Sequence, residues 1–138
     1  MKNNLTNKLL IYSATVALLI VLGLPSRIWP QHFPVWYVEY AADSLWAMMV
    51  YFMIAVIFRF SALAVGGAAL IFAYLIEISQ LFHPPWLESL RSVKLFALVL
   101  GHSFAWSDII AYTLGIALAT AINMFILRVV GENECKNA

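Results

Sequence analysis

The sequence predicts an all-α membrane protein, with four transmembrane helices in a bundle and a short interfacial or re-entrant helix between the third and the fourth. Hydrophobic residues make up 64% of the 138 residues and charged residues 11%, whereas soluble domains average about 45–50% and about 25%. Four apolar segments have the length of about 17–25 residues that a spanning helix needs. We therefore expect one transmembrane domain over residues 1–138.

Prolines mark where the predicted spans end. The first span covers about residues 8–24 and is expected to stop at Pro25, because proline disrupts a helix interior. It resembles a signal peptide but lacks a small-x-small cleavage site, so we expect a retained helix. The second and third spans cover about residues 41–58 and 62–82, and the third should end before Pro84. The fourth covers about residues 107–127.

Two segments between the spans are unsuited to crossing the membrane. Residues 25–40 contain three prolines and are expected to form an interfacial loop, with Trp29, Trp36 and Tyr37 at headgroup level. Residues 95–100 are apolar but too short to span, which predicts the interfacial or re-entrant helix. The tight connection at residues 59–61 predicts that the second and third spans form an antiparallel hairpin.

The distribution of basic residues predicts the orientation. Four spans place both termini on one side of the membrane, and five of the eight Lys and Arg residues fall on that side. Basic loops favour the cytoplasm. We therefore expect both termini in the cytoplasm and the opposite ends of the spans at the outer surface.

Glu77 is the most informative polar residue, because it lies in an otherwise apolar span. A carboxylate in such a place is costly, so it usually faces the protein interior and has a function. Since successive helices alternate in direction, six charged or polar residues are expected at the same outer surface. They are Arg27, Asp43, Glu77, Gln80, Arg91 and Asp108.

Glu77 and Asp108 each lie on a helix face that also carries small residues. Steps of three and four place Gly66, Ala69, Ala73, Glu77 and Gln80 on one face of the third span. The same spacing joins Asp108, Ala111, Gly115 and Ala119 on the fourth, with Tyr112 alongside. Small residues are typical of closely packed membrane helices. The two faces predict a polar pocket lined by Asp43, Glu77, Gln80, Asp108 and Tyr112, with Arg27 and Arg91 as lids.

A purely structural role is the alternative. Arg27 and Arg91 would then pair with the carboxylates and fix the packing of the helices. Asp43 and Asp108 also lie in first helical turns, where negative charge is favoured by the helix dipole. Glu77 lies near the other end of its helix, so the dipole does not explain it.

Several motifs occur in a characteristic order, namely Gly23-Leu24-Pro25-Ser26-Arg27, Asp43-Ser44-Leu45-Trp46-Ala47, Glu77-Ile78-Ser79-Gln80, Arg91, Leu100-Gly101-His102-Ser103-Phe104 and Asp108-Ile109-Ile110-Ala111-Tyr112. Together they resemble domain-of-unknown-function family 2809, a family of small bacterial membrane proteins. The resemblance covers nearly all of residues 9–127. It implies a multi-pass protein of the bacterial cytoplasmic (inner) membrane and names no reaction.

A more distant resemblance is to VanZ-like proteins, which are linked to glycopeptide resistance. It rests on Asp43, Glu77, Gln80, Arg91, Asp108 and Gly115. Ser44, Ala47 and Tyr112 stand where the VanZ-like motif has other residues.

Three classes of function fit the polar residues. The first is an enzyme at the outer leaflet that modifies a phospholipid or a lipid-linked envelope precursor, with Glu77 or Asp108 as the catalytic proton carrier. Its substrate would be bound by Arg27, Asp43, Gln80, Arg91 and Tyr112, since guanidinium groups suit phosphate. The second is a protein that holds a lipid headgroup or an amphipathic antibiotic without turnover. The third is a structural subunit.

Other classes are not expected. The net charge is +1 and no basic block occurs, so nucleic acid is not a predicted partner. His32, His83 and His102 lack the spacing of metal ligands, and no glycine-rich phosphate loop follows a strand, so no metal or cofactor is predicted. The expected partners are membrane lipids. No pattern in the sequence indicates an oligomeric state.

Overall fold

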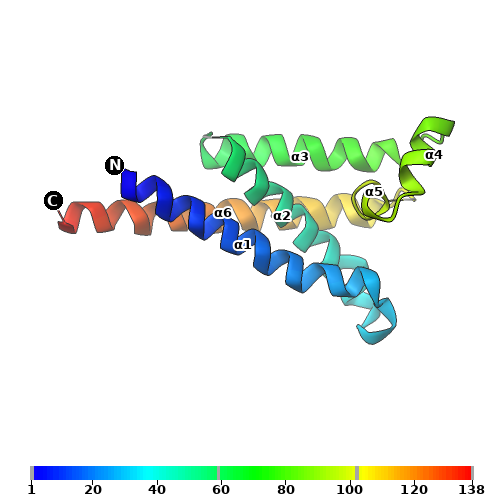
Figure 1. Cartoon of the computed structure of the whole chain (residues 1–138), viewed down its shortest axis with the longest axis horizontal. Helices are drawn as coiled ribbons and strands as arrows, with labels where there is room; N and C mark the ends of the chain where they lie inside the picture. The colour runs from blue at the N-terminus through cyan, green and yellow to red at the C-terminus, as the bar shows by residue number, and fades with distance from the viewer. Residues whose placement is uncertain (1, 59, 102, 138) are drawn as a thin grey trace.

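The computed structural model describes residues 2–58, 60–101 and 103–137, with side chains described from Thr6 to Val130 within those ranges. These residues contain helices and no strand (Figure 1). The longer helices are α1 (Lys2–Ile28), α2 (Ala42–Ile57), α3 (Ala62–Ser79) and α6 (Trp106–Asn137). The shorter ones are a 3-10 helix (Pro30–His32), a π-helix (Tyr37–Ala41), α4 (Pro85–Arg91) and α5 (Lys94–Leu100).

Four segments are long and apolar enough to cross a membrane: Thr6–Ile28, Tyr37–Ile57, Ala62–Ser79 and Trp106–Val130. The expected four-span helical membrane protein is therefore confirmed. The two chain termini lie at one end of the bundle, and α4 and α5 lie at the opposite end, which we call the distal end (Figure 1). Which membrane the bundle crosses, and which side the termini face, stay predictions.

The helix α2 occupies the centre of the packing. It contacts α1, α3 and α6, and α6 also contacts α3. Two glycines on α3 and α6 allow the backbones to approach. A Cβ atom on Gly115 would lie 2.5 Å from the carbonyl oxygen of Ser44 on α2, and one on Gly66 would lie 2.9 Å from Oγ1 of Thr120 on α6. The two faces of small residues are thus contact faces, as the sequence predicts.

The expectation that the first span stops at Pro25 is wrong, because α1 continues through Pro25 to Ile28. Proline removes the backbone donor that would bond the carbonyl of Val21, one turn earlier, and membrane helices tolerate such a loss. Two carbonyls near that one accept side-chain hydrogen bonds. Here the hydroxyl of Ser26 donates to the carbonyl oxygen of Gly23 at 2.7 Å, and the hydroxyl of Tyr37 donates to that of Leu22 at 3.0 Å. The extension carries Arg27 on the last turn of a helix rather than in a loop.

Other parts of the fold also differ from the prediction. The segment expected to be a loop to Tyr40 is shorter, because the π-helix begins at Tyr37 and leads directly into α2. The helix α3 ends at Ser79, three residues before the predicted end at Phe82, and a turn follows. The connection after it holds two short helices rather than one. The second of them, α5, covers the apolar segment 95–100.

A buried polar network crosses the half of the bundle nearer the termini. The hydroxyl of Tyr12 on α1 donates to Oδ1 of Asn123 on α6 at 2.5 Å. Nδ2 of Asn123 donates to the hydroxyl of Tyr51 on α2 at 2.9 Å, and that hydroxyl donates to the carbonyl oxygen of Ala62 on α3 at 3.0 Å. Each of the four long helices therefore contributes to one hydrogen-bonded chain.

Candidate functional site

Glu77 lies in the last turn of α3 and is completely buried. Its carboxylate accepts three hydrogen bonds. The amide of Gln80 and the hydroxyl of Tyr112 donate to Oε2 at 2.9 and 3.2 Å, and the backbone N–H of Ala105 donates to Oε1 at 2.8 Å. A buried carboxylate is tolerated when its oxygens are bonded in this way. Glu77 thus joins α3 to α6 and to the segment that precedes α6.

A cavity of about 340 Å³ opens beside this carboxylate. Its polar lining consists of Arg27 from α1, Asp43 from α2, Gln80 from the end of α3, Ser103, and Asp108 and Tyr112 from α6. Residues 97–99 of α5 and Gly101 form another part of the wall. Four long helices and the α4–α5 connection therefore converge on one space at the distal end.

Of the two carboxylates in the cavity, only that of Asp43 forms an ion pair among the described residues. Nη2 of Arg27 forms an ion pair with Oδ1 of Asp43. Asp108 accepts a hydrogen bond from the hydroxyl of Ser107 at 3.0 Å and forms no ion pair among the described residues. One guanidinium and two carboxylates therefore line the same space.

Aromatic packing orients Tyr112. The ring of Trp46 on α2 lies 5.3 Å from the ring of Tyr112, and Trp46 also stacks on Phe72 of α3 with the ring centres 6.5 Å apart. Ser44, two residues before Trp46, donates a hydrogen bond to the carbonyl oxygen of Ala111 at 3.0 Å. These contacts hold the first turns of α2 and α6 together around the cavity.

Gly101 closes α5 with a backbone that favours glycine. Its φ is +62°, and a Cβ atom there would lie 2.7 Å from the amide nitrogen of Gln80. The chain end of α5 therefore passes directly over the side chain that bonds Glu77.

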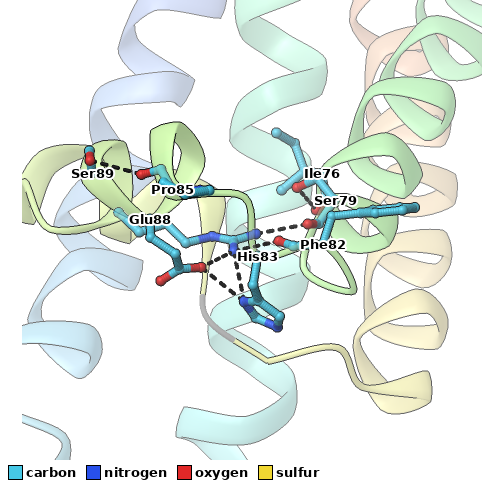
Figure 2. A network of polar contacts seen from close by, with 8 residues as sticks. Ile76, Ser79, Phe82, His83, Pro85, Glu88 and Ser89 are labelled. Carbon is cyan, nitrogen blue, oxygen red and sulfur yellow. Dashed lines mark hydrogen bonds and ion pairs between the residues drawn. The ribbon is translucent and has the colours of Figure 1, made fainter.

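Arg91 lies outside the cavity lining. It bonds to Ser79, Phe82 and Glu88, whose separate polar network Figure 2 shows. Its side chain is 2% exposed. Nη2 donates to the carbonyl oxygen of Ser79 at 2.8 Å, and Nη1 donates to that of Phe82 at 3.0 Å and to Oε1 of Glu88 at 2.7 Å. The carbonyls at the end of a helix lack helical partners and favour a nearby cation. Arg91 thus caps α3 and attaches α4 to it.

Glu88 is the acidic member of this second network. Nδ1 of His83 lies 2.9 Å from Oε1 of Glu88. The hydrogen bonds with His83 and then Arg91 hold the pKa of the Glu88 carboxyl below its usual range. The side chain is 46% exposed, so solvent screens these interactions.

The seven residues singled out from the sequence therefore fall into three positions. Arg27, Asp43, Gln80, Asp108 and Tyr112 line the cavity. Glu77 lies behind Gln80 and Tyr112, and Arg91 lies in the adjacent network. The functional roles assigned to them stay predictions.

Other contributors to the cavity carry no strong sequence signal. Trp46 and Ser103 line it, yet tryptophan is common in membrane proteins and a single serine is not distinctive. The part of the chain that the structure describes contains no group of three or more His, Cys, Asp or Glu side chains arranged to hold a metal ion. His102, one of the three histidines weighed above, lies outside the described residues.

Comparison with protein families matches residues 32–116, more than half of the chain, to the family described as "Protein of unknown function (DUF2809)". The match includes α2, α3 and the α4–α5 connection, and extends into α6 as far as Ile116. No solved structure matches the chain.

Proposed function

The chain belongs to the DUF2809 family, and we propose that it binds the headgroup of a membrane lipid in the cavity at the distal end of the bundle. The family description names no activity. The observation that carries the assignment is a cavity of about 340 Å³ lined by Arg27, Asp43 and Asp108 within a bundle of apolar helices. Charged side chains in membrane helices are costly and typically mark ligand sites.

Size and chemistry both support a headgroup. Small-molecule sites have volumes of about 300–1,000 Å³. The cavity combines hydrogen-bond donors, from Arg27 and the second amide N–H of Gln80, with carboxylate acceptors from Asp43 and Asp108. The hydroxyl of Tyr112 donates its one proton to Glu77, so only its oxygen remains as an acceptor. The lining residues of the cavity lie near the ends of the spans, where the headgroups of a bilayer lie, so a lipid could enter it without leaving the membrane.

Glu77 acts in this proposal as a positioning residue. It has no exposed surface, and its two oxygens already accept three hydrogen bonds. Two of the donors, Gln80 and Tyr112, line the cavity, so the carboxylate fixes the groups that a headgroup would contact. Of the two carboxylates considered as catalytic, Asp108 is the one that reaches the cavity and would carry any proton transfer.

The proposal is tested by measuring how much lipid the purified full chain retains. The protein in detergent is incubated with vesicles of mixed phospholipids and repurified, and bound lipid is identified and quantified by mass spectrometry. Ser103→Trp, which adds a bulky side chain at the wall of the cavity, should lower the bound lipid about tenfold, the equivalent of about 1.4 kcal/mol. Ser92→Trp is the matched control, because Ser92 is exposed and lies outside the cavity lining.

The outcomes separate the three classes of function. Lipid recovered with its mass unchanged supports binding, and lipid of altered mass supports an enzyme. Equal retention by Ser103→Trp and Ser92→Trp would exclude the cavity as the site. The polar residues would then be left with the structural role of holding the helices together.

A further inference from the structure

The net charge of the cavity lining limits which lipid headgroups can bind there. Among the described lining residues, Arg27 supplies one positive charge and Asp43 and Asp108 supply two negative charges. Arg91 cannot offset the excess, because its guanidinium is engaged with Ser79, Phe82 and Glu88. A headgroup with only negative charge would therefore meet a wall of net negative charge.

Arg27 retains capacity for a phosphate. A guanidinium has five N–H donors, and the structure gives the side chain of Arg27 one hydrogen-bond partner among the described residues, Asp43. Asp108, on α6, lines the same cavity and forms no ion pair with a described residue. The cavity thus presents one group for an anion and another for a cation.

An apolar cavity of about 170 Å³ adjoins the polar one. It lies between α1, α2 and α5, and its walls include Leu19, Leu45, Met49 and Leu95. Four residues line both spaces: Arg27, Trp46, Leu98 and Val99. A molecule whose polar part lies beside Arg27 can therefore place an apolar part along α1 and α2.

We propose that the ligand is a zwitterionic phospholipid with an amine in its headgroup. The phosphate contacts Arg27, the ammonium group contacts Asp108, and the first part of one acyl chain lies in the apolar cavity beneath α5. This assignment rests on the proposed headgroup binding and names the class of lipid. Charge-assisted hydrogen bonds at both ends of the headgroup supply the selectivity.

The first test compares two lipids that differ only in the headgroup. Delipidated wild-type protein is incubated with vesicles containing equal amounts of phosphatidylethanolamine and phosphatidylglycerol with identical acyl chains. We expect phosphatidylethanolamine to be retained about tenfold more strongly. Equal retention would overturn the zwitterion assignment but leave headgroup binding intact, whereas retention of neither would remove headgroup binding as well.

A charge-neutral variant locates the amine contact. Asp108→Asn should abolish the preference for phosphatidylethanolamine. It removes the contact with the ammonium group and also the net negative charge of the wall, so retention of phosphatidylethanolamine should fall and that of phosphatidylglycerol should rise. Glu39→Gln is the control, since Glu39 is an exposed carboxylate of the π-helix outside the cavity lining. An undiminished preference in Asp108→Asn would show that the ammonium group binds elsewhere.

A matched pair of glycine variants tests the acyl chain. Gly23 lines the apolar cavity, whereas a Cβ atom on Gly67 of α3 would have open space within 4 Å. Gly23→Leu should lower retention of the diacyl lipid about tenfold, with Gly67→Leu unchanged. Soluble glycerophosphoethanolamine, which lacks the chains, should bind both variants equally. Unaltered retention in Gly23→Leu would exclude the apolar cavity as the chain site.

Discussion

At the scale of single residues, the surroundings of each charged group determine what it can do. Glu77 has its oxygens occupied by Gln80, Tyr112 and the backbone of Ala105, so it stabilises and orients. Asp108 keeps a carboxylate at the cavity surface. The two acids are thirty-one positions apart in sequence and differ in burial, which is a property of the packed bundle.

Arg91 illustrates the same point for a cation. The sequence places it in a loop after the third span, where a lid over the pocket is expected. In the structure its guanidinium is buried against the carbonyls of Ser79 and Phe82. The Nε atom of Arg91 is buried and has no hydrogen-bond partner among the described residues. Arg91 therefore caps α3 with its Nη1 and Nη2 groups, and its Nε–H takes no part.

Glu88 predicts a pH dependence of stability. Its pKa is lowered in the folded protein by the hydrogen bonds with His83 and Arg91. The carboxylate therefore stabilises the fold at pH values above the ordinary value of 4.5, and this contribution is lost as the pH falls through the lowered pKa. The difference in melting temperature between wild type and Glu88→Gln should be present near neutral pH and disappear in acid. Glu39→Gln, at an exposed position outside this network, should show no such convergence.

At the scale of elements, the structure depends on how helix ends are bonded. Pro25 lies inside α1, and the nearby carbonyls of Gly23 and Leu22 accept hydrogen bonds from the side chains of Ser26 and Tyr37. The end of α3 is bonded by a side chain from α4. In both cases side chains supply hydrogen bonds to helix carbonyls.

Arg91 is expected to hold α4 on α3. Arg91→Ala leaves the carbonyls of Ser79 and Phe82 without their charged donor, which should lower the free energy of unfolding by about 1–3 kcal/mol. Arg91→Lys should restore only part of it, because one ammonium group does not reproduce the guanidinium fork. Thermal unfolding in detergent measures both.

Lys94→Ala is the control for these variants, since Lys94 is a nearby exposed cation at the start of α5. A melting temperature of Arg91→Ala equal to that of Lys94→Ala would mean that the network does not stabilise the connection. Hydrogen exchange should locate the change in Arg91→Ala to residues 80–91.

At the scale of the whole molecule, two polar layers tie the helices at opposite ends of the bundle. The distal layer contains Glu77 and the cavity. The other contains Tyr12, Tyr51 and Asn123 and links all four long helices. Apolar and small residues pack between them, including Ala47, Met48 and Ala69. Both layers border a cavity, of about 340 Å³ at the distal end and of about 390 Å³ beside Tyr12 and Asn123. Asn123 itself has two tyrosine partners and is 3% exposed.

Removal of the amide of Asn123 should loosen the whole bundle modestly. Hydrogen bonds between membrane helices contribute about 0.6 kcal/mol on average and at most about 1.7 kcal/mol. We expect Asn123→Leu to lower the free energy of unfolding by an amount of this order. A double-mutant cycle with Tyr12→Phe, measured by unfolding in mixed micelles, isolates the pairwise term. Additive effects of the two substitutions would mean that the Tyr12–Asn123 bond contributes nothing.

The sequence by itself determined the class of the protein, its four spans, the hidden faces of α3 and α6 and most of the residues around the cavity. Local rules suffice for these features, because a span follows from the length of an apolar run and a face follows from helical spacing. Arg27, Asp43, Gln80, Asp108 and Tyr112 could therefore be identified from the order and position of polar residues.

Only the tertiary structure decided how α1 passes Pro25, that Arg91 caps α3, and that Glu77 lies behind the cavity rather than in its lining. It also revealed the network around Asn123, a single amide in an apolar helix. Each of these depends on partners distant in sequence, such as Tyr112 and Ala105 for Glu77. Hydrogen-bond partners of this kind depend on how several helices pack together, so they cannot be predicted from the periodicity of a single helix.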